Sequence, residues 1–120
     1  MDSETEPHTA LVVDDDSGTR TMLRLILELE GWRVLEAGDG REALAKLSRN
    51  GSGPDVVITD IEMPGMNGLE FAARLRERES RLPLLAVTRH PLKGADTDLF
   101  DQVLRKPVSV RALREWLTRH

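Results

Sequence analysis

Cysteine and tyrosine are absent from this 120-residue sequence, which contains only two phenylalanines and two tryptophans. Without cysteine, the chain can form neither a disulfide framework nor a thiolate metal site. With so few aromatic side chains, the hydrophobic core must consist mainly of leucine, valine, isoleucine, alanine and methionine. A chain of this length is expected to form one domain and to bury a core without covalent cross-links.

Long apolar runs and a strong excess of one charge are missing as well. No run approaches the roughly 20 apolar residues that a transmembrane helix requires, and no signal-peptide pattern opens the chain. The net charge is −4, with both signs spread throughout. The sequence therefore shows no basic stripe for direct nucleic-acid contact and no polybasic membrane patch. We expect a cytoplasmic protein with a disordered leader at 1–7 and one domain at 8–120.

Short apolar runs that predict β-strands alternate with segments of helical spacing. The predicted strands are 10–13, 33–37, 56–60, 84–88 and 102–106. The run at 33–37 is more polar than the others, which favours a position at the sheet edge. The apolar positions that predict helices are Met22, Leu23, Ile26 and Leu27; Ala43, Leu44 and Leu47; Leu69, Ala72 and Leu75; and Val110, Leu113, Trp116 and Leu117.

The ends of these helices carry capping residues. Ser17 or Thr19 can cap the first helix, and Gly31 ends it. Asp39 can cap the second helix and Ser109 the last one.

The segment 89–101 has the weakest pattern in the chain. It could hold a short helix around 95–100, but Pro91 and Gly94 weaken its start. Elsewhere, strands alternate with helices, which implies right-handed crossovers and a parallel sheet covered on both faces. The sequence therefore predicts an α/β fold.

Four predicted strands end at, or just before, side chains suited to chemistry. These are Asp14 and Asp15, Asp60, Thr88 and Lys106. The carboxyl ends of parallel strands meet at one edge of a sheet, where such folds bind ligands. Asp15 and Asp60 would form an oxygen-rich site suited to Mg²⁺, which binds one or two carboxylates and keeps several waters. A neighbouring lysine and a threonine hydroxyl could both bind a phosphoryl group.

A carboxylate at such a site can itself be a nucleophile that forms an acyl phosphate, provided that a cation offsets its repulsion of the phosphate. The residues thus predict phosphoryl transfer onto Asp60. Singly, each has a more ordinary interpretation: Asp60 as a turn residue, 14–16 as helix caps, Thr88 as a strand end and Lys106 as a solvated charge. Asp16 is expected only to cap the helix. The joint occurrence of the others in this order favours the site.

Four motifs in the predicted order make the sequence similar to a known family. They are LVVDD at 11–15, ITDIEMPGMNG at 58–68, AVT at 86–88 and RKP at 105–107. The chain resembles the receiver (phosphoacceptor) domain of two-component response regulators, with a chemotaxis-regulator-like fold. The resemblance implies a flavodoxin-like, doubly wound, five-stranded parallel sheet in the order 2-1-3-4-5, with helices on both faces and a short or irregular fourth helix.

The resemblance also implies a role for each site residue. Asp60 would accept phosphate from a phosphohistidine on a sensor histidine kinase or a histidine phosphotransfer protein, as in a phosphorelay. Mg²⁺ would be held by Asp15, Asp60 and the backbone carbonyl of Glu62, with Asp14 acting largely through water.

Thr88 would turn toward the phosphoryl group as the switch hydroxyl, and Lys106 would bind a phosphoryl oxygen. The Lys106–Pro107 peptide is often cis in this family. Phosphorylation would shift the domain between two conformations and so change its affinity for a downstream protein that the sequence does not name. We would not class such a domain as an enzyme.

Two departures from the family pattern affect the switch. Three residues before the lysine, the family's aromatic switch position holds Val103, so the usual inward turn of an aromatic ring cannot be transferred to this chain. The segment from Thr88 to Lys106 is several residues shorter than usual. A short, distorted or absent fourth helix would alter a face that receivers commonly use for partners or dimerisation.

A third departure concerns the surroundings of the site. Arg89 follows the threonine where the family usually has a small residue, and this cation could crowd the site or help to hold phosphate. We hypothesise that Glu62 and His90, which flank the site, tune the hydrolysis of the acyl phosphate.

Two other functions stay open. One is a degenerate receiver that acts as an interaction module without phosphorylation, as Val103 and the shortened segment suggest. The other is a small aspartate-nucleophile phosphohydrolase, which typically has a second acid two residues after the nucleophile. Glu62 offers only a partial match to that pattern.

Overall fold

The computed structural model describes residues 8–47, 53–79 and 81–120. The predicted leader at 1–7 lies outside the described residues. Within them, five strands and the helices between them alternate along the chain, as the hydrophobic pattern predicts. No helix in the described part of the chain is both long and apolar enough to cross a membrane.

All five strands are parallel and form one sheet in the order β2-β1-β3-β4-β5. This order is the one that the resemblance implied, and β2 lies at an edge as its polar pattern predicts. Their bounds are β1 Thr9–Val13, β2 Arg33–Ala37, β3 Val56–Asp60, β4 Leu84–Thr88 and β5 Gln102–Arg105. Every residue of β3 and β4 is buried, which is typical of central strands with helices on both faces.

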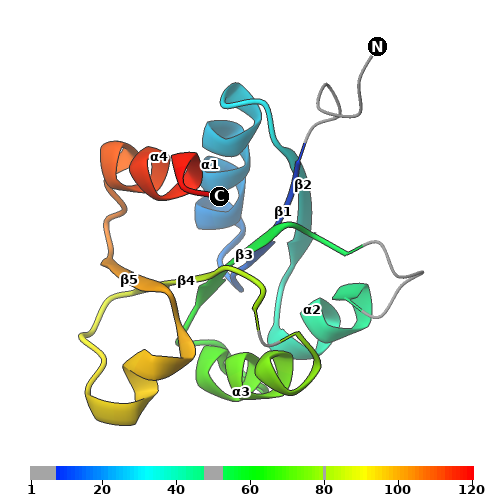
Figure 1. Cartoon of the computed structure of the whole chain (residues 1–120), viewed down its shortest axis with the longest axis vertical. Coiled ribbons are helices and arrows are strands. Elements are labelled where there is room, and N and C mark those ends of the chain that lie inside the picture. Colours follow the sequence, from blue (N-terminus) through cyan, green and yellow to red (C-terminus); the bar gives the residue numbers. More distant parts are fainter. Residues whose placement is uncertain (1–7, 48–52, 80) are drawn as a thin grey trace.

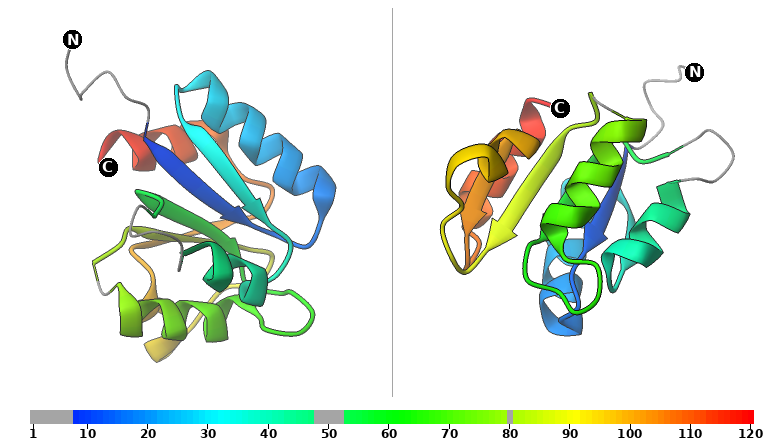
Figure 2. Two further views of the ribbon diagram at one scale, coloured as in Figure 1. Left: turned by 90° about the vertical axis from the view of Figure 1, so that its right-hand side faces the viewer. Right: turned by 90° about the horizontal axis from the view of Figure 1, so that it is seen from below.

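Helices cover both faces of this sheet (Figures 1 and 2). On one face lie α1 (Ser17–Leu29) and α4 (Val110–Thr118), and on the other lie α2 (Gly40–Leu47) and α3 (Gly68–Arg78). A 3₁₀ helix, Gly94–Leu99, stands where the fourth helix of the family was expected, so the label α4 belongs to the last helix. The expectation of a short fourth helix is confirmed.

Each face of the sheet has its own hydrophobic core because alternate residues of a strand point to opposite faces. In β1, Leu11 and Val13 pack with α2 and α3, while Ala10 and Val12 pack with α1 and α4. Trp116, one of the apolar positions that predicted the last helix, is buried against the second group. Both layers thus hold the central strands in place, and with them the residues at the carboxyl ends of those strands.

Three local predictions about helix ends are confirmed. Gly31, which follows α1, has a φ of +92°, a left-handed conformation that glycine adopts readily. Asp39 accepts a hydrogen bond from the backbone N–H of Glu42, and Ser109 accepts one from that of Ala112. These two side chains satisfy backbone donors at the starts of α2 and α4.

Other local predictions were wrong. Ser17 or Thr19 does not cap α1; the cap is Asp16, as its expected capping role implied, because its carboxylate accepts hydrogen bonds from both the N–H and the hydroxyl of Thr19. β5 ends at Arg105, one residue before the predicted end, although the N–H of Lys106 still donates to the carbonyl of Thr88.

Candidate functional site

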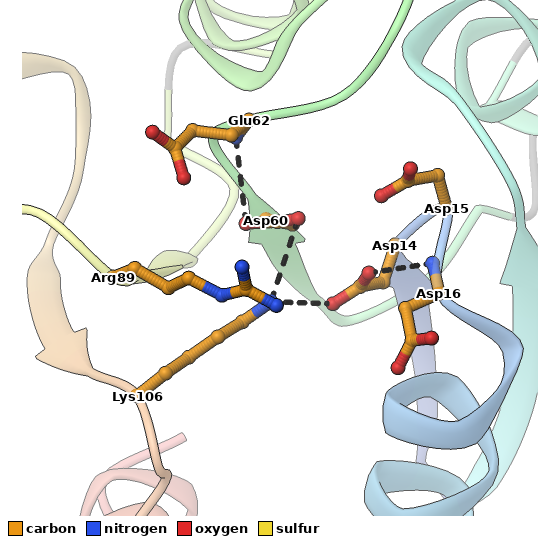
Figure 3. A pocket seen from close by; sticks show the side chains of 7 residues that line it. All are labelled: Asp14, Asp15, Asp16, Asp60, Glu62, Arg89 and Lys106. Carbon is orange, nitrogen blue, oxygen red and sulfur yellow. Dashed lines mark hydrogen bonds and ion pairs between the residues drawn. The ribbon is translucent and has the colours of Figure 1, made fainter.

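A pocket opens at the carboxyl ends of the strands, where the predicted site residues converge (Figure 3). Five carboxylate residues and two cationic residues line it. They are Asp14, Asp15 and Asp16 after β1; Asp60 and Glu62 at and after the end of β3; Arg89 after β4; and Lys106 after β5. The parallel sheet therefore brings together residues that are widely separated in the sequence.

Three of these acids form a compact group. Asp14, Asp15 and Asp60 each offer a carboxylate oxygen, and these oxygens all lie within 4.8 Å of one another. Asp14 and Asp60 are buried, whereas Asp15 is exposed. A group of hard oxygen ligands that is open to water on one side fits Mg²⁺ better than a softer metal ion.

Lys106 lies between two of the acids. Its Nζ is 3.2 Å from Oδ2 of Asp14 and 3.4 Å from Oδ2 of Asp60. The lysine side chain is only 14% exposed, so solvent screens these contacts less than it would at the surface. The ammonium group thus offsets part of the repulsion between the two buried carboxylates.

Asp60 is 6% exposed, and its carboxyl group is held by the chain that follows it. Its Oδ1 accepts hydrogen bonds from the backbone N–H of Ile61 at 2.8 Å and, more weakly, from that of Glu62 at 3.4 Å. Burial, followed by the nearby charge of Asp14, raises the pKa of Asp60; Lys106 and the two hydrogen bonds oppose that rise. Oδ2 faces the lysine and the pocket.

The loop after β3 requires glycine where α3 begins. Gly68 donates its N–H to the carbonyl of Ile61 at 2.8 Å. A Cβ at this position would lie 2.1 Å from the backbone oxygen of Asp60. No larger residue fits without moving the backbone of the candidate phosphoacceptor. The cap of α3 is Asn67, whose side chain accepts a hydrogen bond from the N–H of Glu70. The helix therefore starts just before Leu69, the first of the apolar positions that predicted it.

Arg20 is a residue of the site region that sequence reasoning missed. Its Nη1 donates to the backbone carbonyl of Asp14 at 2.7 Å, and its Nε lies 3.1 Å from Glu36 on β2. The sequence signal that could have identified Arg20 was its position one helical turn after Asp16, on the same side of α1 as the buried Leu23. A charged residue at an inward-facing position beside an acidic turn indicates a role in holding that turn.

Asp16, which was expected only to cap the helix, also lines the pocket. The hydrogen bonds from the hydroxyl and the N–H of Thr19 lower its pKa, and the charges of Lys106 and Arg89 add to this effect.

The structure brings Thr88 to the site but not into the lining of the pocket. The residue is buried at the end of β4, and its hydroxyl oxygen accepts a hydrogen bond from the N–H of His90 at 3.2 Å. Nε2 of His90 lies 3.2 Å from Oε2 of Glu62, and both side chains are exposed. The two residues hypothesised to tune hydrolysis are therefore in direct contact, which the sequence did not indicate.

Val103 lies on β5 beside Ala86 of β4. It is half-buried and packs against the core on the face covered by α2 and α3. The Lys106–Pro107 peptide is cis, as the resemblance implied.

Comparison with known proteins places this arrangement in a family. The model of the response regulator receiver domain matches residues 10–118. The chain belongs to this receiver domain family. The solved receiver domain from Methylobacillus flagellatus has a TM-score of 0.86 at 27% identity, and the match covers 95% of this chain and 98% of that one. The doubly wound receiver fold is thereby confirmed.

A second solved structure bears on the acidic pocket of this receiver domain. The response regulator TrrA from Thermotoga maritima, solved in complex with Mg²⁺ and beryllofluoride, has a TM-score of 0.86 and 31% identity. The match covers 93% of this chain and 97% of that protein. The pocket of the present receiver, with its three clustered carboxylates, is compatible with Mg²⁺.

Curated relatives of this receiver domain are longer proteins. The transcriptional regulatory protein TrcR from Mycobacterium tuberculosis is 37% identical over 111 residues, covering 89% of this chain and 42% of that protein. The response regulator MprA from Mycolicibacterium vanbaalenii is 39% identical over 112 residues, covering 89% and 47% respectively. The chain thus spans less than half the length of these relatives.

Proposed function

We propose that this receiver domain accepts a phosphoryl group on Asp60 from a phosphohistidine of a sensor histidine kinase or histidine phosphotransfer protein. The observation that carries the proposal is the grouping of three carboxylate oxygens within 4.8 Å, with Lys106 bridging two of the acids. A structural role would not require so many like charges at one edge of the sheet. Their mutual repulsion is costly unless a cation is to be bound among them.

In the proposed reaction, Oδ2 of Asp60 attacks phosphorus and the P–N bond of the donor breaks. The electron pair of that bond returns to the imidazole ring, which leaves neutral because its other nitrogen already carries a proton. Mg²⁺, when bound by Asp15, Asp60 and the carbonyl of Glu62, would offset the negative charge that the phosphoryl group brings. Lys106, already 3.4 Å from Asp60, would bind a phosphoryl oxygen.

Asp14 would support this site indirectly. Its Oδ2 contacts Lys106 and its Oδ1 accepts the N–H of Asp16. These contacts hold the carboxylate beside the pocket, where it would act on the metal through water.

Thr88 would act as the switch in this proposal. Its hydroxyl would give up the contact with the N–H of His90 and turn toward the phosphoryl group, moving the β4 end and changing partner affinity. Val103, on β5, packs against the core and has no aromatic ring that could follow the movement of Thr88. We therefore expect the output to depend on the backbone of β4 and the short 3₁₀ helix.

The contact between Glu62 and His90 supports a tuning role for the pair. Glu62 follows the phosphoacceptor by two residues, and His90 follows the switch threonine by two, so their contact lies beside the expected path of the attacking water. Exchanging both for alanine should change the decay rate of the acyl phosphate. An unchanged decay rate would remove this part of the proposal.

The domain would act as a stoichiometric phosphoacceptor in the cytoplasm and not as an enzyme that turns over substrates. The downstream partner is not named by these observations. Two relatives are called transcriptional regulatory protein and response regulator. Our prediction that there is no direct nucleic-acid contact concerns this chain alone and stays a prediction.

Intact-protein mass spectrometry after incubation with acetyl phosphate tests the proposal. The wild type with Mg²⁺ should gain one phosphoryl group, and neither Asp60→Asn nor the wild type in EDTA should do so. A wild type that gains nothing and does not bind Mg²⁺ would favour the phosphorylation-independent interaction module. Sustained turnover of small phosphate esters would instead support the phosphohydrolase alternative.

A further inference from the structure

Arg89 differs from the other basic side chains near the pocket. Figure 3 shows its side chain extending from the end of β4 toward the acids, and its atoms line the pocket. Lys106 is engaged by two carboxylates and His90 by a third. Arg89, by contrast, makes no side-chain hydrogen bond or ion pair within 8–47, 53–79 and 81–120. Its guanidinium group is therefore available to a ligand.

The charge of the pocket indicates which ligand this guanidinium group could bind. Five acidic side chains and only two cationic ones surround a space that an anionic phosphodonor must enter. Lys106 is largely buried between Asp14 and Asp60, so it would bind the phosphoryl group beside Asp60 and not at the mouth of the pocket. An exposed guanidinium can meet the donor at the mouth, and its planar shape allows two parallel hydrogen bonds to a pair of phosphoryl oxygens.

We propose that Arg89 is a phosphoryl-binding residue that favours anionic phosphodonors, its guanidinium pairing with oxygens of the group that is transferred to Asp60. The proposal deepens, and rests on, the phosphorylation proposed above. With acetyl phosphate, the bond from Asp60 to phosphorus forms as the P–O bond to acetate breaks. The electron pair leaves with acetate, and Arg89 neither gains nor loses a proton. If its bulk merely obstructed the pocket, removing the side chain would have the opposite effect on rate.

The kinetic test compares Arg89→Gln and Arg89→Lys with the wild type and with Arg33→Gln. Arg33 is an exposed arginine at the start of β2, at the other end of the sheet from the pocket. Labelling of Asp60 by acetyl phosphate with Mg²⁺ should be about three- to fivefold slower in Arg89→Gln, the effect of one exposed ion pair. Arg89→Lys should retain most of the rate, Arg33→Gln should match the wild type, and added salt should narrow the difference.

An equilibrium test separates this proposal from the phosphorylation itself. Inorganic phosphate is titrated into the protein with Mg²⁺ present, and its binding is followed through the NMR signals of 60–62 and 88–90. The affinity for phosphate should be about three- to fivefold weaker in Arg89→Gln than in the wild type. A wild type that is never labelled but binds phosphate in this Arg89-dependent way would refute phosphorylation and uphold the role of Arg89. Equal phosphate affinity of the two proteins, or faster labelling of Arg89→Gln, would overturn the role of Arg89.

Discussion

The carboxyl group of Asp60 is buried beside that of Asp14, and both conditions raise its pKa. Since this pKa is higher in the folded chain than in the unfolded one, the folded chain holds the proton more tightly. The stabilisation is complete below the unfolded pKa and is lost as the pH rises through the folded pKa. As the pH rises above the ordinary pKa of an aspartate, the buried Asp60 therefore destabilises the metal-free domain. This cost is expected of a site whose carboxylates are arranged to bind a cation.

Replacement of Asp60 by asparagine tests whether the buried carboxylate destabilises the metal-free domain. Asparagine keeps an oxygen that can accept the N–H of Ile61, and it removes the buried charge. Asp60→Asn should raise the midpoint of thermal unfolding at pH 7 in EDTA, and the gain should shrink as the pH falls toward 3.8, the ordinary value for an aspartate. Asp98→Asn, at an exposed position of the 3₁₀ helix, is the matched control and should change little. A lower midpoint for Asp60→Asn would contradict the raised pKa.

At the scale of elements, the junction between β3 and α3 depends on Gly68. Gly68→Ala would place a Cβ 2.1 Å from the carbonyl oxygen of Asp60 and 2.7 Å from Cα of Ile61. Since both are backbone atoms, the strand end must shift. We expect a loss of about 1–3 kcal/mol in the free energy of unfolding, together with slower labelling of Asp60.

Chemical denaturation and mass spectrometry measure these two effects of Gly68→Ala. Gly53→Ala provides the control, because a Cβ there meets nothing within 4 Å. If Gly68→Ala matched the wild type in stability and labelling, the close approach of α3 to Asp60 would not constrain the site.

Helix α1 presents an apolar stripe to solvent. Met22, Leu25 and Leu29 are 41%, 51% and 84% exposed, at positions that share one side of a helix. The helix starts beside the pocket, directly after the acids that follow β1. A protein that brings a phosphohistidine to Asp60 must cover the pocket mouth, so we expect it to contact the first half of this stripe.

A negative charge introduced into this stripe should slow labelling of Asp60 by a phosphohistidine protein but not labelling by acetyl phosphate. Met22→Glu and Leu25→Glu should slow labelling by a cognate phosphohistidine protein at least tenfold and leave labelling by acetyl phosphate unchanged. Leu35→Glu is the control, since Leu35 is similarly exposed but belongs to β2 and pairs with Leu11, whose side chain packs on the opposite face. Equal loss with both donors would mean that the substitutions disturb the site itself.

At the scale of the whole molecule, the order of the strands builds the site. β1 and β3 are neighbours in the sheet although a helix, an edge strand and a second helix separate them in sequence. This adjacency sets the acids after β1 beside Asp60, and the position of β5 beyond β4 lets Lys106 reach across to both. The two hydrophobic layers hold these strand ends in place from opposite faces.

The sequence by itself determined the elements and most of the candidate site, because these depend on local patterns. The continuous apolar runs of β3 and β4 predicted buried central strands, and Asp39 and Ser109 were recognised as helix caps from their position before amphipathic segments. At the start of α1, Asp16 was expected to cap the helix and so was Ser17 or Thr19, because three residues with capping side chains compete at that turn. Only their packed conformations show that Asp16 accepts both hydrogen bonds from Thr19.

The tertiary structure alone decided the electrostatics of the site. The bridge from Lys106 to two acids and the contact of Glu62 with His90 arise between side chains at the ends of different strands. The raised pKa of Asp60 arises from its burial and from the neighbouring Asp14. Charge interactions depend on distance and on burial, and a linear sequence specifies neither. Strand ends predict which groups meet, but only the packed sheet determines how near they come and how much water is left between them.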